Sequence, residues 1–373
     1  MTAQEDWMGN VVLVLASSTG GIGAHVASLT QGLAAGGVNV VVGGPEAAQR
    51  QFRFTDRGAA FTPIEIPPNL HPSDMRAVRS LKRLLATARP DVVHAHGLRA
   101  GLAATLARPA CPLVVTWHNA PLQGGLRGRA HKMVERIVGR AAAVTLCASS
   151  DLVSRAKAVG ARDARLAPVA APALPPARRG RAAMRAGLGV AENAIAVLSV
   201  GRLHPQKGYQ TLIKTAARWR DMDPVPHVLI AGEGPSYLDL AASVSELRAP
   251  VTLLGHRKDV ADLLAAADVA VVSSVWEARQ LFAQEALTAG VPLIATAVGG
   301  IPELVGDAAA LIAPSDPDAL DRAFRALAAD PQARAELAAR GRKRAELWPD
   351  EKSTVAGVRA LYAELTGAGQ VRG

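Results

Sequence analysis

Two cations in the C-terminal half of the sequence have the types and spacing of a phosphate-binding site. Arg202 and Lys207 follow an apolar run in the segment SVGRLHPQKGYQTLI, and Lys207 lies where a helix is expected to start. Fixed cations beside a helix N-terminus suit a diphosphate, which carries about two negative charges. The segment lacks the Gly-Lys-Ser/Thr of a Walker loop, so we predict a nucleotide-diphosphate site of another kind.

Two carboxylates further along the chain have a spacing that suits one extended ligand. Glu277 and Glu285 are separated by seven residues. If most of that stretch is helical, the two side chains lie about 12 Å apart along the axis. The paired acids of a glycosidase are only about 5–9.5 Å apart. We therefore expect the two glutamates to contact distant parts of a single ligand.

A glycine-rich turn near the N-terminus is a second candidate phosphate site. The segment ASSTGGIGAHVASL (residues 16–29) follows the apolar run NVVLVLA, and Gly21 and Gly23 open a helical pattern. Glycines there let backbone N–H groups approach a phosphate at the helix N-terminus. The dinucleotide fingerprint is incomplete, because Val26 occupies the third glycine position and no acidic residue ends the next strand. A tight turn without a ligand stays an alternative.

These segments lie within a regular alternation of strands and helices, which predicts parallel sheets with helices on both faces. The expected strands and helices, in chain order, are strands at 10–16, 38–43, 61–66, 91–95, 113–117 and 143–147, helices at 22–36, 73–88, 99–107, 127–140 and 149–158, and a second series of strands at 194–201, 227–232, 251–255, 269–274, 292–297 and 309–313.

The alternation lapses once, in a Pro-, Ala- and Arg-rich stretch at 166–193 that we interpret as an interdomain linker leading into a short helix. We predict an N-terminal domain (1–170), a C-terminal domain (171–348), and a final helix and tail (349–373) that crosses back to the N-terminal domain. The fold class is α/β, with two Rossmann-like domains facing across a cleft.

The ordered set of segments resembles glycosyltransferase family 4, enzymes of the GT-B fold that use nucleotide sugars. The resemblance covers nearly the whole chain and rests on GGIGAHV, PDVVHAHG, VVTWHN, VGRLHPQKG, LIAGEGP, ADVAVVSS, the Glu-x7-Glu pair and GVPLIATAVGGIPELV. It implies that residues 1–170 form the acceptor-side domain and residues 171–348 the nucleotide-sugar-binding domain. It also implies transfer of a hexosyl or N-acetylhexosaminyl group with retained configuration. The departing phosphate would take the proton of the acceptor on the same face.

The resemblance also implies roles for individual residues. Glu277 would face the transferred sugar, and His118 stands at the position of a histidine near the sugar C6 hydroxyl; these are the candidate catalytic residues. Gly21 would cradle the donor phosphates, and Glu285 would bind the ribose hydroxyls. His96 is expected to line the cleft.

The cationic pair has a role in the same scheme, because Arg202 and Lys207 would hold the diphosphate and stabilise the leaving group. The sequence departs from the family after the first glutamate, where Ala278, Arg279 and Gln280 replace the common Gly-Phe-Gly. We still expect backbone amides at Gln280 and Leu281 to contact the donor. Arg279 either adds a donor contact or points outward.

No cofactor and no metal are expected, and the donor is a UDP-, GDP- or ADP-sugar. An Asp-x-Asp pair, Asp221 and Asp223, occurs in RDMDPVP. We interpret it as an ordinary loop, because it lies on the side of the sheet away from the strand ends. No cysteine–histidine cluster has the spacing of a zinc site.

Composition narrows the class of protein and its partners. The chain has 373 residues, of which 49% are hydrophobic and 20% charged, with a net charge of +10. The charge favours anionic partners, whereas 3% aromatics make stacking on nucleic acid improbable. Two cysteines, Cys111 and Cys147, suit a reducing cytoplasm, and no apolar stretch is long enough to span a membrane.

Two basic helical segments of the N-terminal domain could contact an anionic membrane. We expect their apolar residues to pack on the sheet, with Ser73 and Asp74 capping the first helix and the cations solvated. Weak contact at the inner face of the membrane, and a lipid-linked acceptor, follow as hypotheses. In the first segment the apolar residues are Met75, Val78, Leu81 and Leu85, and the cations are Arg76, Arg79, Lys82 and Arg83. In the second segment the apolar residues are Met133 and Ile137, and the cations are Arg127, Arg129, Lys132, Arg136 and Arg140.

Three alternatives remain open from the sequence. A GT-B nucleotide-sugar epimerase would share the fold, although the Glu-x7-Glu pair argues against it. A non-catalytic nucleotide-sugar-binding protein is suggested by the altered Ala278–Gln280 segment. A dehydrogenase would need a nicotinamide site, and no Tyr-x-x-x-Lys pair supports it.

Overall fold

The computed structural model describes residues 7–17, 20–120 and 125–367, without the side chains of Leu126 and Arg127. The chain forms two compact units. The N-terminal unit comprises the chain up to Pro172 and again from Pro349, and the C-terminal unit spans Ala173–Trp348. The boundaries expected from the sequence were 170/171 and 348/349, and the division of the structure lies at 172/173 and 348/349.

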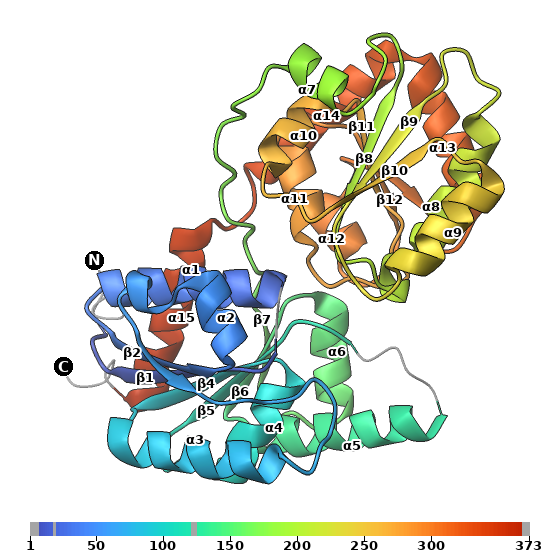
Figure 1. The fold of residues 1–373 in the computed structure, drawn as a ribbon. Coiled ribbons are helices and arrows are strands. Elements are labelled where there is room, and N and C mark those ends of the chain that lie inside the picture. Colours follow the sequence, from blue (N-terminus) through green and yellow to red (C-terminus); the bar gives the residue numbers. More distant parts are fainter. Residues whose placement is uncertain (1–6, 18–19, 121–124, 368–373) are drawn as a thin grey trace. The chain divides into compact units, whose positions relative to one another are not determined.

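Within the described residues, the N-terminal unit is built on a parallel seven-stranded sheet of order β3-β2-β1-β4-β5-β6-β7 (Figure 1). Its strands are β1 (Asn10–Leu15), β2 (Asn39–Gly44), β3 (Ala60–Pro63), β4 (Val92–His96), β5 (Leu113–Trp117), β6 (Val144–Cys147) and β7 (Ala164–Leu166). Its helices are α1 (Gly21–Ala35), α2 (Glu46–Phe52), α3 (Asp74–Ala88), α4 (Leu98–Ala107), α5 (Gly125–Ala141), α6 (Ser150–Ala158) and α15 (Glu351–Thr366).

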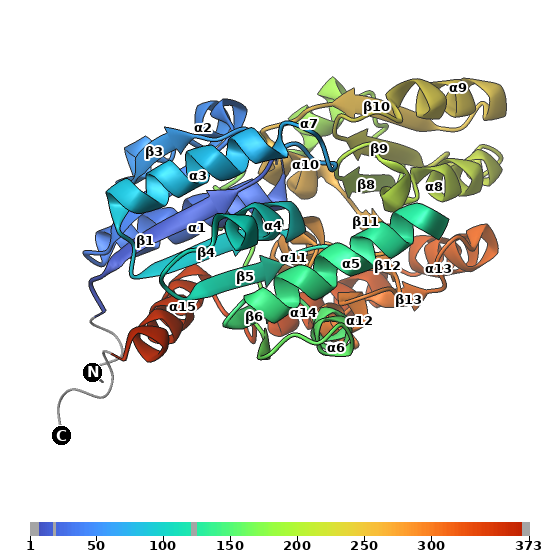
Figure 2. The same cartoon turned by 90° about the horizontal axis from the view of Figure 1, so that it is seen from below.

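Helices cover both faces of this sheet, with α1 and α15 on one face and α3, α4 and α5 on the other (Figures 1 and 2). Such a sheet needs strands that are apolar on both sides, and residues 11–15 of β1 are all buried. The last helix, α15, completes the first face, because Leu361 and Tyr362 enter the core formed by β1 and α1. The indole N–H of Trp7 also donates to Thr366 Oγ1, at 3.0 Å.

The C-terminal unit repeats the plan with six parallel strands in the part of the chain that the structure describes, in the order β10-β9-β8-β11-β12-β13. The strands are β8 (Ala196–Val200), β9 (His227–Ala231), β10 (Val251–Gly255), β11 (Val269–Val272), β12 (Leu293–Thr296) and β13 (Ala310–Ile312). The helices are α7 (Arg181–Gly187), α8 (Tyr209–Ala216), α9 (Tyr237–Leu247), α10 (Val260–Ala266), α11 (Leu281–Thr288), α12 (Ile301–Val305), α13 (Pro317–Ala329) and α14 (Pro331–Ala345).

Strand β8 shows why the C-terminal sheet is covered on both sides. Ala196 and Leu198 point into one core with Phe282 of α11, whereas Val197 points into a second core with Trp219 and Phe324. Successive side chains of a strand face opposite sides, so an uninterrupted apolar strand requires a helical layer on each. Both units are therefore Rossmann-like, as the alternation predicted.

In the N-terminal unit, a short strand and a short helix were not predicted from the sequence. Strand β7 has three residues, including the polar Arg165, and adds to the edge of the sheet beside β6. Helix α2 has seven residues and is followed by Arg53, whose φ of 53° is left-handed. Both elements are too short to carry a clear periodicity.

The first basic helix, α3, packs largely as expected. Val78 and Leu81 are buried and the four cations are exposed, but Met75 is 53% exposed and does not belong to the buried stripe. The predicted cap is wrong in detail, since Ser73 occupies the N-cap position without capping the helix through its side chain. The Ser73 hydroxyl is instead 2.8 Å from Nδ1 of His71.

The second basic helix, α5, differs from the expectation. Val134 and Val138 are buried in place of Met133 and Ile137, which are 54% and 40% exposed. Met133 and Ile137 are one turn apart, so they form one exposed apolar strip. Arg129, Lys132, Arg136 and Arg140 are exposed on the same helix, whereas the side chain of Arg127 lies outside the described residues. In the described part of the chain, no helix is both long enough and apolar enough to cross a membrane.

Candidate active site

The candidate donor site begins at the carboxyl ends of β8 and β11, which are neighbours in the C-terminal sheet. The helices that follow these strands cover opposite faces of the sheet, and ligands of open α/β sheets bind at the strand ends where this happens. Gly208 has a φ of 64°, and a Cβ there would overlap the carbonyl oxygen of Ser273. Glycine therefore allows the loop after β8 to lie against the end of β11.

Three further contacts hold these two loops together. The Val275 N–H donates to the Gln206 carbonyl at 2.8 Å, and Gln206 Nε2 donates to the Trp276 carbonyl at 2.9 Å. The Ser273 hydroxyl donates to the Lys207 carbonyl at 3.0 Å. The two loops therefore form one connected surface.

Lys207 and Glu277 form an ion pair at the centre of this surface. Lys207 Nζ lies 2.6 Å from Glu277 Oε1, and the Ser274 hydroxyl donates to the same oxygen at 2.7 Å. The two charged side chains are only 16% and 8% exposed. The sequence predicted separate ligand contacts for the two residues, and the structure brings them together. Ser274 was not singled out, because its role depends on this contact.

The loop conformation corrects two expectations from the sequence. Lys207 ends a short 3-10 turn (Pro205–Lys207), and α8 begins two residues later. Glu277 precedes α11, so only the second part of the Glu-x7-Glu stretch is helical. The Glu277 carbonyl accepts from the Gly300 N–H at 2.9 Å, which fixes the backbone beside the carboxylate.

Helix α11 positions the remaining predicted residues of this unit. Gln280 occupies its N-cap, and Gln280 Oε1 accepts from the Ala283 N–H at 3.1 Å. Its side chain is thus engaged with the helix, whereas Leu281 at the first helical position presents a backbone amide that has no partner four residues earlier. Glu285 lies one turn further, and burial raises its pKa to about 7.

The two arginines of the site differ in their surroundings. Arg202 is exposed on the loop after β8. The pKa of His204 is lowered mainly by burial and, to a smaller extent, by the positive charges of Arg202 and Lys207. The Arg279 guanidinium stacks over the Trp348 ring, with 5.5 Å from Cζ to the ring centroid. Burial lowers the pKa of Arg279 to about 10. Arg279 therefore packs within the unit, which the sequence could not decide.

In the N-terminal unit, Gly21 is the first residue of α1 and is exposed. Ser18 and Thr19 of the glycine-rich turn lie outside the described residues. Gly23 has a packing role, because a Cβ there would overlap the Phe52 ring of α2. One glycine of the motif is thus explained by helix packing, which the sequence had not predicted.

His118 lies just after β5, beside His96 at the end of β4. His96 Nδ1 is 3.3 Å from His118 Nε2, and both rings are buried. His25 of α1 lies against both, with ring centroids 5.5 Å and 5.4 Å away. Burial, with smaller effects of neighbouring histidines, holds the pKa of His118 well below its usual range. The sequence did not single out His25, because it is 71 residues from His96.

Asp221 and Asp223 lie in the turn before β9, at the end of the sheet opposite to the donor loops. The Asp221 side chain is 86% exposed and lies 3.9 Å from Arg220. The structure thus places the Asp-x-Asp pair in a loop away from the site, as the sequence analysis proposed.

Two Rossmann-like units with a lysine–glutamate pair at the strand ends of the second define a protein of the GT-B class. Comparison with known proteins gives the family. Residues 20–172 match the model of the glycosyl transferase 4-like domain, and residues 180–344 match that of glycosyl transferases group 1. The chain belongs to this family of glycosyltransferases, and the transferase prediction is confirmed.

Individual relatives agree with this assignment. The chain is 31% identical over 312 residues to D-inositol 3-phosphate glycosyltransferase of Salinispora arenicola, covering 74% of this chain and 69% of the relative. It is 31% identical over 363 residues to glycogen synthase of Mycobacterium tuberculosis, covering 87% and 86%.

A solved structure with the same fold is Anabaena Alr3699/HepE in complex with UDP and glucose. It matches with a TM-score of 0.78 at 19% identity, over 94% of this chain and 98% of that chain. At that identity the likeness concerns the fold.

Proposed function

We propose that the Lys207–Glu277 pair marks the site where the C-terminal unit binds the diphosphate and the sugar of a nucleotide-sugar donor. The pair joins a cation and a carboxylate at 2.6 Å beside a helix N-terminus. The relatives support a sugar-transfer reaction, and the Anabaena structure of the same fold contains UDP and glucose. The donor is a UDP-, GDP- or ADP-sugar.

The chemistry follows the movement of charge. Breaking the anomeric C–O bond leaves negative charge on the β-phosphate and positive character on the sugar. Arg202, Lys207 and the Leu281 backbone amide stabilise the departing phosphate. Glu277 faces the sugar, and Glu285 accepts hydrogen bonds from the ribose hydroxyls. The leaving phosphate takes the proton of the acceptor on the same face of the sugar, so the configuration is retained.

His118 and Gly21 are the proposed contributions of the N-terminal unit. The His118 ring is neutral near pH 7, since its pKa is lowered. One of its ring nitrogens pairs with His96, and the other can donate to or accept from a sugar hydroxyl. Gly21, at the exposed start of α1, offers backbone N–H groups to the donor phosphates.

We propose that the transfer step requires no metal ion, because the cations and helix amides supply the positive charge that the leaving group needs. Arg202→Ala and Lys207→Ala are expected to weaken binding of the nucleoside diphosphate by roughly 1.5–3 kcal/mol each. Asp223→Ala is the matched control and leaves binding unchanged. Turnover that stops both with EDTA and in Asp223→Ala would contradict the metal-free scheme.

The strip on α5 supports a further proposal, that the enzyme meets its acceptor at an anionic membrane surface. Met133 and Ile137 are exposed together with cations on the same helix, which is the pattern of an interfacial helix. Each suitably placed cation contributes about 1 kcal/mol near an anionic leaflet. On this basis we propose a lipid-linked acceptor at the inner face of the membrane.

The donor class is tested by thermal shift with UDP, GDP and ADP and their sugars. A ligand at a hundredfold excess over Kd adds about 2.7 kcal/mol to the free energy of unfolding. The matching donor, incubated without acceptor, should be hydrolysed slowly, and Lys207→Ala should reduce both effects. Binding without any hydrolysis or transfer would favour a non-catalytic binding protein, which the family assignment does not support.

A further inference from the structure

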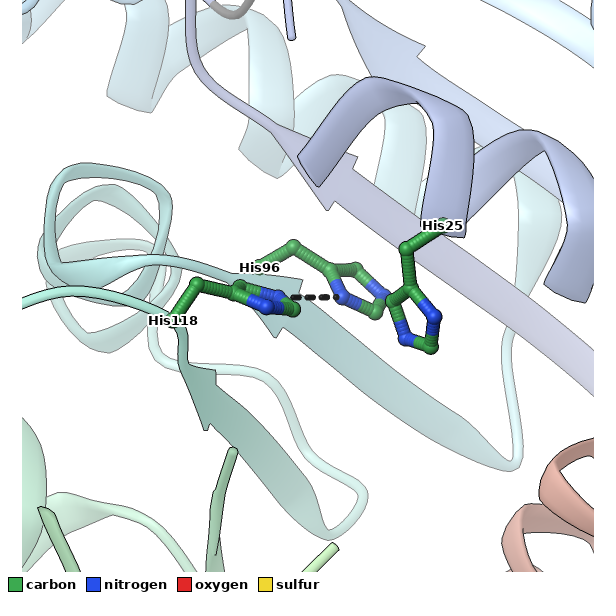
Figure 3. Close-up of side chains that lie close together, drawn as sticks. All are labelled: His25, His96 and His118. Carbon is green, nitrogen blue, oxygen red and sulfur yellow. Dashed lines mark hydrogen bonds between the residues drawn. The ribbon is translucent and has the colours of Figure 1, made fainter. Parts of the chain in front are cut away.

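Three histidines of the N-terminal unit converge at the carboxyl edge of its sheet, although they come from distant parts of the sequence. His25 belongs to α1, His96 ends β4, and His118 follows β5. Their ring centroids form a nearly equilateral triangle with sides of 5.4, 5.5 and 5.6 Å. One ring nitrogen of each lies within 4.8 Å of the others (Figure 3).

The surroundings of these rings suit metal coordination. All three rings are buried, which favours the neutral imidazole that keeps a lone pair. His96 Nε2 is buried and has no hydrogen-bond partner among the described residues. An unsatisfied buried nitrogen costs about 1–3 kcal/mol, which a metal bond would offset.

A second layer holds the central ring in place. His94 stacks on His96 with ring centroids 4.2 Å apart. The His94 ring is itself fixed at both nitrogens, with Nδ1 2.7 Å from the Tyr362 hydroxyl and Nε2 2.7 Å from the Thr116 hydroxyl. A preorganised ring loses little conformational freedom on binding an ion.

We propose that His25, His96 and His118 form a site for a first-row transition metal, best Zn²⁺, whose occupation inhibits the enzyme. Three imidazoles with an open fourth position are a recurring zinc set, whereas Mg²⁺ and Ca²⁺ prefer oxygen ligands.

The separation of the three rings is compatible with zinc. Zn–N bonds of about 2.0–2.1 Å in tetrahedral geometry place ligand nitrogens about 3.4 Å apart. One ring nitrogen of each histidine lies within 4.8 Å of the others, so the rings need to approach by at most about 1.4 Å for one ion to contact all three.

Inhibition rests on the proposed function, because it follows from the role of His118 beside the sugar. Zinc on His118 takes the lone pair that the sugar hydroxyl would use and adds two positive charges where the sugar develops positive character. Metal binding itself does not depend on that role. The transfer step remains metal-free, so a chelator raises the activity of zinc-loaded enzyme.

The site is tested with untagged full-length protein and Co²⁺, whose visible absorption reports tetrahedral nitrogen coordination. One Co²⁺ per chain should bind and be displaced by Zn²⁺ but not by Mg²⁺. His25→Asn and, separately, His96→Asn should weaken binding more than about 100-fold, since even partners of metal ligands typically contribute 10–100-fold. His204→Asn, in the other unit, is the control and keeps the wild-type affinity.

Thermal melts of each variant establish that it is folded. Equal Co²⁺ affinity in the wild type and in a folded His25→Asn variant, or no binding by the wild type, overturns the site. In a transfer assay, the Zn²⁺ concentration for half inhibition should rise more than about tenfold in His25→Asn, each variant compared with its own metal-free rate. Co²⁺ binding without inhibition by Zn²⁺ would keep the site and overturn the inhibition.

Discussion

Replacement of Glu277 by glutamine should lower turnover without weakening nucleotide binding. In the free protein, the Glu277 carboxylate lies 2.6 Å from the Lys207 ammonium that we assign to the donor diphosphate. Glu277→Gln keeps the shape and an acceptor oxygen for the Ser274 hydroxyl, but removes the charge. Lys207 is then released for the diphosphate, while the sugar loses a charged neighbour.

The magnitudes follow from the burial of the pair. A hydrogen bond to a charged group contributes about 1.5–3 kcal/mol. The loss of that amount from the transition state alone lowers kcat roughly 10- to 150-fold. The side chains are 16% and 8% exposed, so water screens the pair only in part. Release of Lys207 should therefore leave the Kd for the nucleoside diphosphate unchanged or lower it by up to about tenfold.

Isothermal titration with the nucleoside diphosphate, together with steady-state transfer rates, measures both quantities. Glu336→Gln, at an exposed position of α14, is the matched control and should change neither. A Kd that rises about tenfold with an unchanged kcat would refute the reasoning, because Glu277 would then act in binding the nucleotide.

Three further predictions concern other parts of the structure. Glu285 has a pKa raised to about 7 by burial, so the folded state binds more protons than the unfolded state between about pH 4.5 and 7. The contribution of Glu285 to stability is thus lost as pH rises through that window, whereas the donor KM should fall as the carboxylate forms. In Glu285→Gln, both pH dependences should disappear. A pH dependence that persists in this variant would exclude Glu285 as its cause. Gly208→Ala should lower the free energy of unfolding by about 1–3 kcal/mol in urea titrations, because the added Cβ would overlap backbone atoms at a positive φ. Gly357→Ala is the control: Gly357 lies in a helix with open space around it, so this change should raise the free energy of unfolding by about 0.5–1 kcal/mol. Co-sedimentation with anionic liposomes at low salt should fall about tenfold or more when Met133 and Ile137 are both changed to Asp, because two apolar contacts are removed. If the wild type does not sediment with the liposomes, the proposed membrane contact is excluded.

The architecture could be predicted because its information is local. An apolar run such as residues 10–15, followed by a glycine turn and a helical pattern, specifies one strand–helix unit without reference to the rest of the chain. The order of such units then gives two parallel sheets. The same reasoning fails for a short edge strand such as Ala164–Leu166, whose pairing is decided by the neighbouring β6.

The site could be predicted only as a set of separate residues. Lys207 and Glu277 are 70 residues apart, and each was assigned to the ligand because spacing gives no sign of a contact between them. A search for zinc spacing likewise finds nothing in residues as distant as 25, 96 and 118. The signal that was available is positional, since His96 and His118 each stand at the carboxyl end of a predicted parallel strand.

The return of α15 to the N-terminal sheet affects the order in which the protein acquires its structure during synthesis. The C-terminal unit is one continuous stretch, so it needs no later segment of the chain to complete it. The first sheet, although translated earlier, must wait for Tyr362, whose hydroxyl meets His94 across a separation of 268 residues. Until then, apolar side chains of β1 and α1 remain open to solvent and to other nascent chains. Synthesis of α15 is therefore the step that allows the core of the N-terminal sheet to close.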